Sequence, residues 1–138
     1  MSESVQHTRL VQAIIAQLDT DLGPLCDIMV CDDSPNPLRG ERPPKLSGFI
    51  PDVYATDVPT TRVVVGEAKT EQDLETTRSH LQITAFLTYL SAMRNSLFIL
   101  AVPFCCIPRG NNLLQELTRT SDTPPLIRVI DDFGLEHG

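Results

Sequence analysis

The chain is predicted to be a single α/β domain, residues 1–138, in which a mixed β-sheet is flanked by helices on both faces. Three observations predict this class. Apolar residues recur at helical spacing in long segments, and short apolar runs bounded by turn residues indicate strands. These segments follow one another in the order αβββαβαβ. A length of 138 residues suffices for one domain with a substantial core but not for two.

The first helix is expected over residues 3–22, where apolar residues recur every three or four positions and Gly23-Pro24 follows. The next run, 25–31, is short and apolar, which predicts a strand. A loop is expected over 32–47, because four prolines stand in it and proline interrupts both helices and sheets.

Two further strands are predicted over 48–56 and 62–69, with a turn at 57–61 between them. The helix that follows is expected over 70–94. We expect it to open at Thr70-Glu71-Gln72-Asp73, which has the spacing of a capping box with Asp in place of the usual Glu.

The last third of the chain contains a continuous apolar run, 97–105, which predicts a buried strand. A short helix is expected over 111–118, a last strand over 126–130 and a tail over 131–138. Strands and helices that alternate in this order favour a mixed sheet with helices on both faces.

The net charge of −7 counts against broad electrostatic adhesion to nucleic acid, which depends on lysine and arginine side chains that neutralise phosphates. A local basic cluster nevertheless stands in the proline-containing loop, namely Arg39, Arg42 and Lys45. Two interpretations stay open for this cluster: a solvated loop and a contact to the nucleic-acid backbone.

The sequence contains no apolar run that approaches the roughly 20 residues of a membrane span. Residues 1–6 also lack a basic region followed by an apolar stretch, so no secretory signal is visible. We therefore expect a cytoplasmic protein with no membrane partner.

The four cysteines, Cys26, Cys31, Cys105 and Cys106, do not form the paired C-x2-C spacing of common metal sites. Buried free thiols are the expected state, and a zinc or iron–sulfur site is the less favoured alternative. Adjacent residues of a strand point to opposite faces, so Cys105 and Cys106 are not expected to share one site.

The candidate functional residues stand at the two middle strands. Asp52 follows Pro51, and Glu67-Ala68-Lys69 closes an apolar stretch. Strand alternation places Glu67 and Lys69 on one face. Carboxylates are the ligands that Mg²⁺ prefers, so a divalent-metal site is expected if Asp52 lies beside them. A strand-edge carboxylate and a surface ion pair are the alternative interpretation.

Asp52 followed by Glu67-Ala68-Lys69 resembles the signature of the PD-(D/E)xK nuclease superfamily, which has the restriction-endonuclease-like fold. The αβββαβ core of that fold has the element order expected here over residues 3–105. Residues 82–86, Gln-Ile-Thr-Ala-Phe, are similar to the QxxxY helix motif of the RecB-like branch, with Phe86 in the place of the tyrosine.

The resemblance implies a Mg²⁺ or Mn²⁺ site held by Asp52, Glu67 and the main-chain carbonyl oxygen of Ala68. Members of the RecB-like branch often add a histidine of the first helix, and other superfamily members add a glutamate. His7 and Glu3 are the candidates for that ligand here. Both stand near a terminus, where a frayed position without a role is the alternative.

The catalytic set that the resemblance implies is Asp52, Glu67, Lys69 and Gln82. A bound metal would lower the pKa of a water and stabilise developing charge, and Lys69 would orient or help deprotonate that water. Gln82 and Arg78 are i and i+4 on the expected helix, so both would project toward backbone phosphates from one face. A solvated helix face is the alternative for this pair.

Three interpretations of the whole chain result. The first is a magnesium-dependent nuclease that hydrolyses DNA phosphodiester bonds, alone or as a homo-oligomer, since many proteins of the family's fold cut two strands as pairs. The second is a catalytically inactive nuclease-fold protein that binds or assembles, which the acidic charge and Phe86 favour. The third is an unrelated α/β domain, in which Asp52 and Glu67 would lie far apart or on opposite faces.

Overall fold

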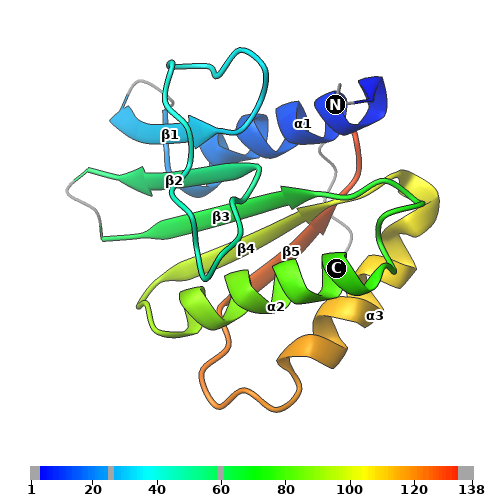
Figure 1. Cartoon of the computed structure of the whole chain (residues 1–138). Helices are drawn as coiled ribbons and strands as arrows, with labels where there is room; N and C mark the ends of the chain where they lie inside the picture. The colour runs from blue at the N-terminus through cyan, green and yellow to red at the C-terminus, as the bar shows by residue number, and fades with distance from the viewer. Residues whose placement is uncertain (1–3, 25–26, 59–60, 134–138) are drawn as a thin grey trace.

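The computed structural model describes residues 4–24, 27–58 and 61–133, which form an α/β fold (Figure 1). A five-stranded mixed sheet and three α-helices lie within these residues, as the sequence predicts at the level of fold class. The elements along the chain are α1 (Val5–Asp21), β1 (Ile28–Asp32), β2 (Val53–Asp57), β3 (Val63–Ala68), α2 (Thr77–Ser91), β4 (Ser96–Ala101), the 3-10 turn η2 (Phe104–Cys106), α3 (Ile107–Thr118) and β5 (Leu126–Ile130).

The strands lie in the order β1-β2-β3-β4-β5, so each strand pairs with its neighbours in sequence. β1 and β2, and β2 and β3, are antiparallel, whereas β3, β4 and β5 are parallel. Every residue of β3 and β4 is buried, as expected for parallel strands that are covered on both faces. β3 is therefore the strand at which the antiparallel and parallel halves meet.

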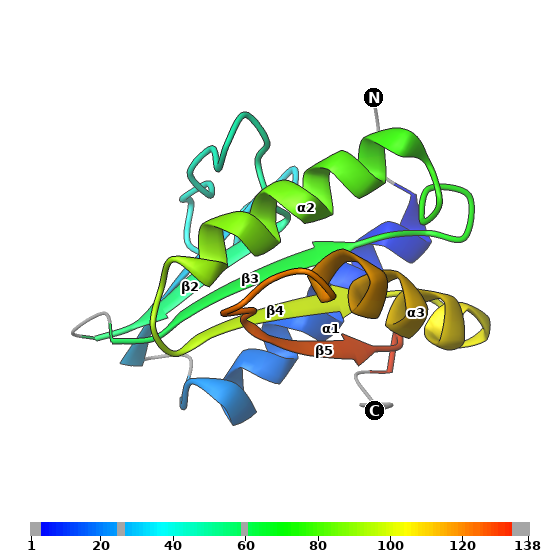
Figure 2. The ribbon, with the colours of Figure 1, turned by 90° about the horizontal axis from the view of Figure 1, so that it is seen from below.

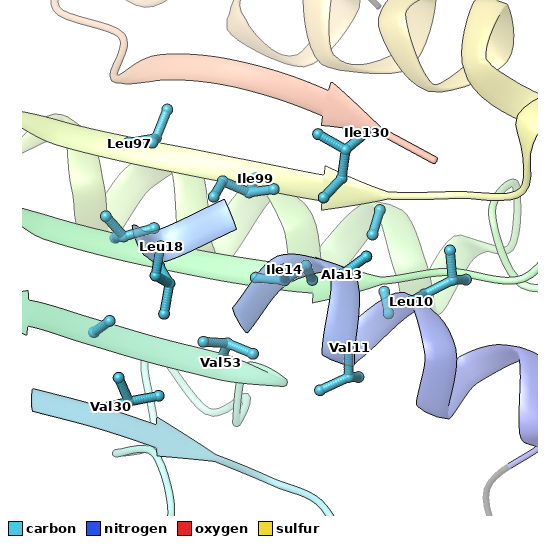
Figure 3. Packing of buried hydrophobic residues seen from close by; sticks show 14 of the residues in the cluster. Leu10, Val11, Ala13, Ile14, Leu18, Val30, Val53, Leu97, Ile99 and Ile130 are labelled. Atoms are coloured by element: carbon cyan, nitrogen blue, oxygen red, sulfur yellow. The ribbon is translucent and has the colours of Figure 1, made fainter. Parts of the chain in front are cut away.

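Helix α1 covers one face of the sheet, and α2 and α3 cover the other (Figure 2). On the α1 side, Leu10, Ile14 and Leu18 of the helix pack against Val53 and Ile99 of the sheet (Figure 3). These three helix residues are four positions apart, so they lie on one face of the helix, and that face is buried. The packing fixes α1 over β3, and with it the residues of its first turn.

The opposite face holds a second apolar cluster, built from β3 and β4 together with α2 and α3. Val63 and Val65 of β3 belong to this cluster, whereas Val64 belongs to the α1 side, so the strand alternates as the sequence predicts. Phe86 of α2 is fully buried, and its ring centroid lies 6.5 Å from that of Phe98. Phe86 is thus a core residue.

The strand expected over 48–56 begins only at Val53. Before it, Leu46 and Phe49 form an isolated antiparallel bridge around a tight turn. Ser47 and Gly48 in this turn have positive φ angles of 51° and 92°, which a strand cannot contain. The prediction was wrong here because the turn chemistry of Ser47-Gly48 was overlooked.

Helix α2 begins at Thr77 and ends at Ser91, rather than spanning 70–94. The side chain of Thr76 caps it by accepting a hydrogen bond from the Ser79 N–H at 3.1 Å. Thr70 does contact Asp73, with Oγ1 donating to Oδ2 at 3.1 Å, but the pair closes a turn. Leu74 is fully buried, and its N–H donates to the Thr70 carbonyl oxygen at 3.1 Å within the same turn.

The apolar run expected as one strand over 97–105 is divided in two. β4 ends at Ala101, Pro103 follows, and residues 104–106 form η2. Helix α3 starts at Ile107 with a proline in its first turn, earlier than the expected residue 111, because proline is tolerated there. The last strand lies at 126–130 as predicted.

The remaining boundaries shift by a few residues. α1 spans 5–21 rather than 3–22, and β1 spans 28–32, while residues 25 and 26 of the strand expected there lie outside the described residues. The same holds for 134–138 of the expected tail. None of the described helices has the length and apolar composition needed to cross a bilayer.

Candidate functional site

Asp52 and Glu67 meet because β2 and β3 are antiparallel neighbours. Val53 and Gly66 are register partners, so the residue before β2 lies beside the residue after Gly66. The Asp52 N–H donates a hydrogen bond to Glu67 Oε1 at 3.0 Å. The Ala68 N–H in turn donates to Asp52 Oδ2 at 2.8 Å. The two acids therefore lie together, and the condition that would have established an unrelated α/β domain is not met.

Lys69 joins the same group from the end of β3. Its Nζ lies 3.2 Å from Glu67 Oε2 and donates a hydrogen bond to Gln82 Oε1 at 2.5 Å. The side chains of Lys69 and Glu67 are only 10% and 4% exposed, so this is not a solvated surface ion pair. Gln82 comes from α2, so this contact links the helix to the acid–lysine strand end.

His7 reaches the group from the first turn of α1. The Ser4 side chain caps this helix by accepting a hydrogen bond from the His7 N–H at 3.0 Å, which fixes the backbone of His7. His7 Nε2 lies 3.3 Å from Asp52 Oδ2. The structure thus places the first-helix histidine beside the acids, and Glu3, the other candidate, lies outside the described residues.

These side chains line one cavity of about 790 Å³. Lys45 of the basic loop and Arg78 of α2 line it as well. The Arg78 guanidinium carbon lies 5.6 Å from the centre of the Phe49 ring, a cation–π contact that holds this cation at the rim. Of the charged side chains that line the cavity, Glu67 and Lys69 are buried, whereas Lys45 and Arg78 are exposed.

Arg39 and Arg42 are not among the residues that line this cavity. Arg39 Nη1 donates to the Ile28 carbonyl oxygen at 2.5 Å. Arg42 Nη1 donates to Asp33 Oδ1 at 3.1 Å and to the Ser34 carbonyl oxygen at 2.8 Å. These hydrogen bonds join the loop to the first residue of β1 and to the turn that follows β1.

Asp33 and Asp73, which were not among the predicted site residues, also line the cavity. The Asp33 N–H donates to the Asp52 carbonyl oxygen at 2.9 Å, so the loop starts beside the candidate centre. The sequence could have indicated Asp33, because Asp33 directly follows β1 and Asp52 directly precedes β2. The end of one strand lies beside the start of its antiparallel neighbour. Asp73 was interpreted as a helix-capping residue because of its spacing from Thr70, so its place at the cavity was not predicted.

Glu67 carries the clearest electrostatic perturbation of the site. Burial raises its pKa well above the usual range, and the neighbouring Asp52 carboxylate raises it further, while the Lys69 ammonium opposes both. Two close carboxylates in a buried position favour a proton or a cation between them. A divalent cation held by both carboxylates would relieve this repulsion.

The two carboxylates and the backbone carbonyl of Ala68 are oxygen donors that fit a hard divalent cation, and the His7 imidazole adds a nitrogen donor of the kind that transition metals take. Their spacing is less compact. In the described part of the chain, the group of three histidine, cysteine or acidic donors whose atoms all lie within 4.8 Å of one another is Glu71, Cys105 and Cys106. His7, Asp52 and Glu67 do not form such a group, and a cation at Glu67 competes with the Lys69 ammonium for Oε2.

Comparisons with protein-family models, with curated proteins and with solved structures found no match to this chain.

Proposed function

We propose that the chain is a metal-dependent nuclease that hydrolyses DNA phosphodiester bonds, with a restriction-endonuclease-like fold of the RecB-like kind. One observation carries this proposal: Asp52, Glu67, Lys69 and Gln82, which three separate elements supply, converge in one cavity. His7 adds a nitrogen donor 3.3 Å from Asp52. Carboxylates can hold a metal that activates water, and an ammonium beside them can stabilise developing charge, so these residue types suit metal-assisted phosphodiester hydrolysis.

Asp52, Glu67 and the Ala68 carbonyl oxygen would hold Mg²⁺ or Mn²⁺, with His7 as a further ligand. When bound, the ion supplies Lewis-acid stabilisation of the phosphate and lowers the pKa of a water. Lys69 then orients the attacking water or offsets the charge that develops on the phosphate. Its hydrogen bond to Gln82 at 2.5 Å holds the ammonium in place for that role.

The substrate backbone would approach along the rim of the cavity. Arg78 and Lys45 both line it and carry the positive charge that phosphates need. Arg78 and Gln82 stand one helical turn apart on α2, so one helix face presents both a cation and an amide. A rim of this kind supports backbone contact without base readout, and hence cleavage that depends little on sequence.

The test is cleavage of linear, circular and single-stranded DNA by the purified protein with Mg²⁺ or Mn²⁺. We expect cleavage that Glu67→Ala and Lys69→Ala each abolish. Glu116→Ala is the matched control, since Glu116 is an exposed residue of α3 that pairs with its helix neighbour Arg119. Intact DNA in all three forms with both metals would overturn the enzyme proposal.

A nuclease-fold protein that binds without cutting is the second candidate. The spacing of His7, Asp52 and Glu67 favours it, because these donors are not gathered as closely as three ligands of one ion. Manganese titration separates the two candidates: a catalytic site binds Mn²⁺ and loses it in Asp52→Ala. Protein that binds DNA but neither Mn²⁺ nor Mg²⁺ would establish the second candidate.

A homo-oligomer would bring two such cavities to the two strands of a duplex. Supercoiled plasmid reports on this arrangement, because paired cavities produce linear molecules directly and single ones produce nicked circles first. Sedimentation of the same sample gives the oligomeric state. Nicked circles from a sedimenting monomer would contradict the paired arrangement while leaving the nuclease proposal intact.

A further inference from the structure

The turns after β3 and β4 bring Cys105, Cys106 and Glu71 together. β3 and β4 are parallel neighbours, with Ala68 and Ala101 as register partners, so the turns that follow them lie at one edge of the sheet. Glu71 stands in the first turn and the two cysteines stand in η2. The two cysteines were expected to point apart because a strand was predicted there, and they are not on one.

The separation of the sulfurs matches a chelating geometry. Cys105 Sγ and Cys106 Sγ lie 3.8 Å apart. Two sulfurs about 2.3 Å from one zinc ion, at the tetrahedral angle, lie about 3.8 Å from each other. A carboxylate oxygen of Glu71 is within 4.8 Å of both. Three ligands of suitable type are therefore already placed around one point.

Exposure gives a metal access to this point from solvent. Glu71 and Cys105 are exposed, whereas Cys106 is buried. Two of the three donors therefore reach solvent, and the third is fixed in the protein interior. In the free protein Cys106 is a thiol, since burial and the Cys105 neighbour raise its pKa to about 11. The vicinal pair is free rather than joined in a disulfide.

Arg109 supplies the balancing charge. Its Nη1 lies 3.8 Å from Cys106 Sγ and 3.7 Å from Glu71 Oε1, and its Nη2 lies 3.0 Å from Glu75 Oε2. Two thiolates and the carboxylates of Glu71 and Glu75 carry four negative charges, of which a divalent ion and the Arg109 guanidinium together offset three. A guanidinium beside a ligating sulfur and a carboxylate is the outer-sphere support that metal sites use.

We infer that Glu71, Cys105 and Cys106 form a second metal site, which takes a thiophilic divalent cation, Zn²⁺, and leaves a fourth position to water. Binding forms two zinc–sulfur bonds and releases the two thiol protons to solvent, with no change of oxidation state. The site is separate from Asp52 and Glu67 and prefers a softer ion because of its thiolates.

The ion would tie the turn after β3 to η2 beside the candidate active site. Thr70, Gln72 and Asp73 flank Glu71 in the chain, and all three line the 790 Å³ cavity. Cross-linking Glu71 to two cysteines therefore stiffens one wall of that cavity. Its role is structural support, and its presence does not depend on whether the cavity cuts DNA.

The experiment uses Co²⁺ as a coloured probe for Zn²⁺ on the full, reduced chain. We expect a thiolate-to-cobalt charge-transfer band that saturates at one Co²⁺ per chain and that Zn²⁺ abolishes by displacing the Co²⁺. Cys105→Ser should weaken binding by about tenfold or more and lower the band, and Glu71→Gln should weaken binding by a similar factor. Cys31→Ser is the matched control and should keep the full band, because Cys31 lies outside the cluster.

Cys105 is the residue to change because it is exposed, so its replacement does not disturb the core. Asp52→Ala separates the two metal sites and should keep the thiolate band. Three results would overturn the inference: no thiolate band from reduced protein, an unchanged band and affinity in Cys105→Ser, or Zn²⁺ binding that disappears in Asp52→Ala. Thermal unfolding gives a second readout, since Zn²⁺ should raise the melting temperature of wild type more than that of Cys105→Ser.

Discussion

The candidate cavity and the basic loop that precedes it use charged side chains in opposite ways. In the cavity, Glu67 and Lys69 are almost fully buried and contact each other and Gln82. In the loop, the exposed Arg42 pairs with Asp33 and a backbone carbonyl, while Arg39 is bonded to the Ile28 carbonyl. The charged side chains of the cavity contact one another, whereas those of the loop bond to the backbone and to Asp33 and thereby stabilise the loop.

The difference shows that the charge of a segment does not reveal its role. A nucleic-acid contact was one interpretation of Arg39, Arg42 and Lys45 as a set, but only Lys45 lines the cavity. A buried charged group costs free energy unless it is paired, so the buried pair at Glu67 and Lys69 is the more informative observation. Variants that affect only one region test this contrast.

The largest expected effect is on cleavage. Lys69→Met should reduce the rate by about 100- to 1,000-fold, ~3–4 kcal/mol of transition-state stabilisation, because the ammonium beside the phosphate is lost. Arg42→Ala, the loop counterpart, should leave the rate within about twofold and cost at most ~1 kcal/mol of stability. Plasmid cleavage under single-turnover conditions measures both. Equal losses in the two variants would break the contrast.

Two glycines give the next contrast. A Cβ added at Gly66 would lie 2.5 Å from Ile14 Cγ2, a branched methyl that cannot rotate away freely in a helix. Gly66→Ala should therefore cost about 1–3 kcal/mol and shift α1, which carries His7, away from β3. Denaturant unfolding measures the cost, and metal binding measures the shift.

Gly40 is the matched loop position. Its φ of +72° is strained for alanine, while a Cβ there meets nothing within 4 Å. Gly40→Ala should cost about 1–2 kcal/mol through backbone conformation and leave metal binding unchanged. Loss of metal binding in Gly40→Ala would mean that the loop conformation shapes the cavity.

The pH dependence of stability sharpens the description of the cavity. The folded-state pKa of Glu67 is raised above its ordinary value of 4.5, so the folded state binds the proton more tightly than the unfolded state. The stability from this group is complete below pH 4.5 and is lost as pH rises through the raised pKa, at about 1.36 kcal/mol for each pH unit between the two pKa values. Glu67→Gln lacks this loss, so its stability relative to wild type should increase as pH rises.

Chemical denaturation in a metal chelator, over a series of pH values, measures that difference. Mg²⁺ should then oppose the decline in wild type, because a cation replaces the proton, and should have less effect on Glu67→Gln. A difference between the two proteins that is constant with pH would contradict the assigned electrostatics.

The smallest effects concern DNA affinity. On the slow-cutting Lys69→Met background, Lys45→Ala should weaken binding several-fold and lower the slope of log affinity against log salt by about 1. Arg39→Ala should leave that slope unchanged, since its guanidinium is bonded to the Ile28 carbonyl. Fluorescence anisotropy over a salt series measures both slopes. If Arg39→Ala lowered the slope as much as Lys45→Ala does, Arg39 would also contact the nucleic acid.

Two predictions that depend on residues close together in the chain were confirmed, whereas one that depends on contacts between distant residues was less accurate. The stripe of Leu10, Ile14 and Leu18 and the alternation along β3 are properties of neighbouring residues, and both appear in the structure. The start of α2 was misplaced because Thr70 and Thr76 offer similar local caps. The structure uses the cap at Thr76, and Leu74, which stands between the two threonines, is fully buried in contacts that the local sequence does not specify.

Periodicity and residue chemistry are local properties, so they are enough to predict the α/β class, the apolar faces and the candidates Asp52, Glu67, Lys69 and Gln82. Which of these groups meet depends on how distant segments pack. Antiparallel pairing of β2 and β3 placed Asp52 on Glu67, helix packing brought His7 to Asp52, and parallel β3 and β4 joined Glu71 to two cysteines. These contacts join residues far apart in the chain, and strand register and helix packing set them.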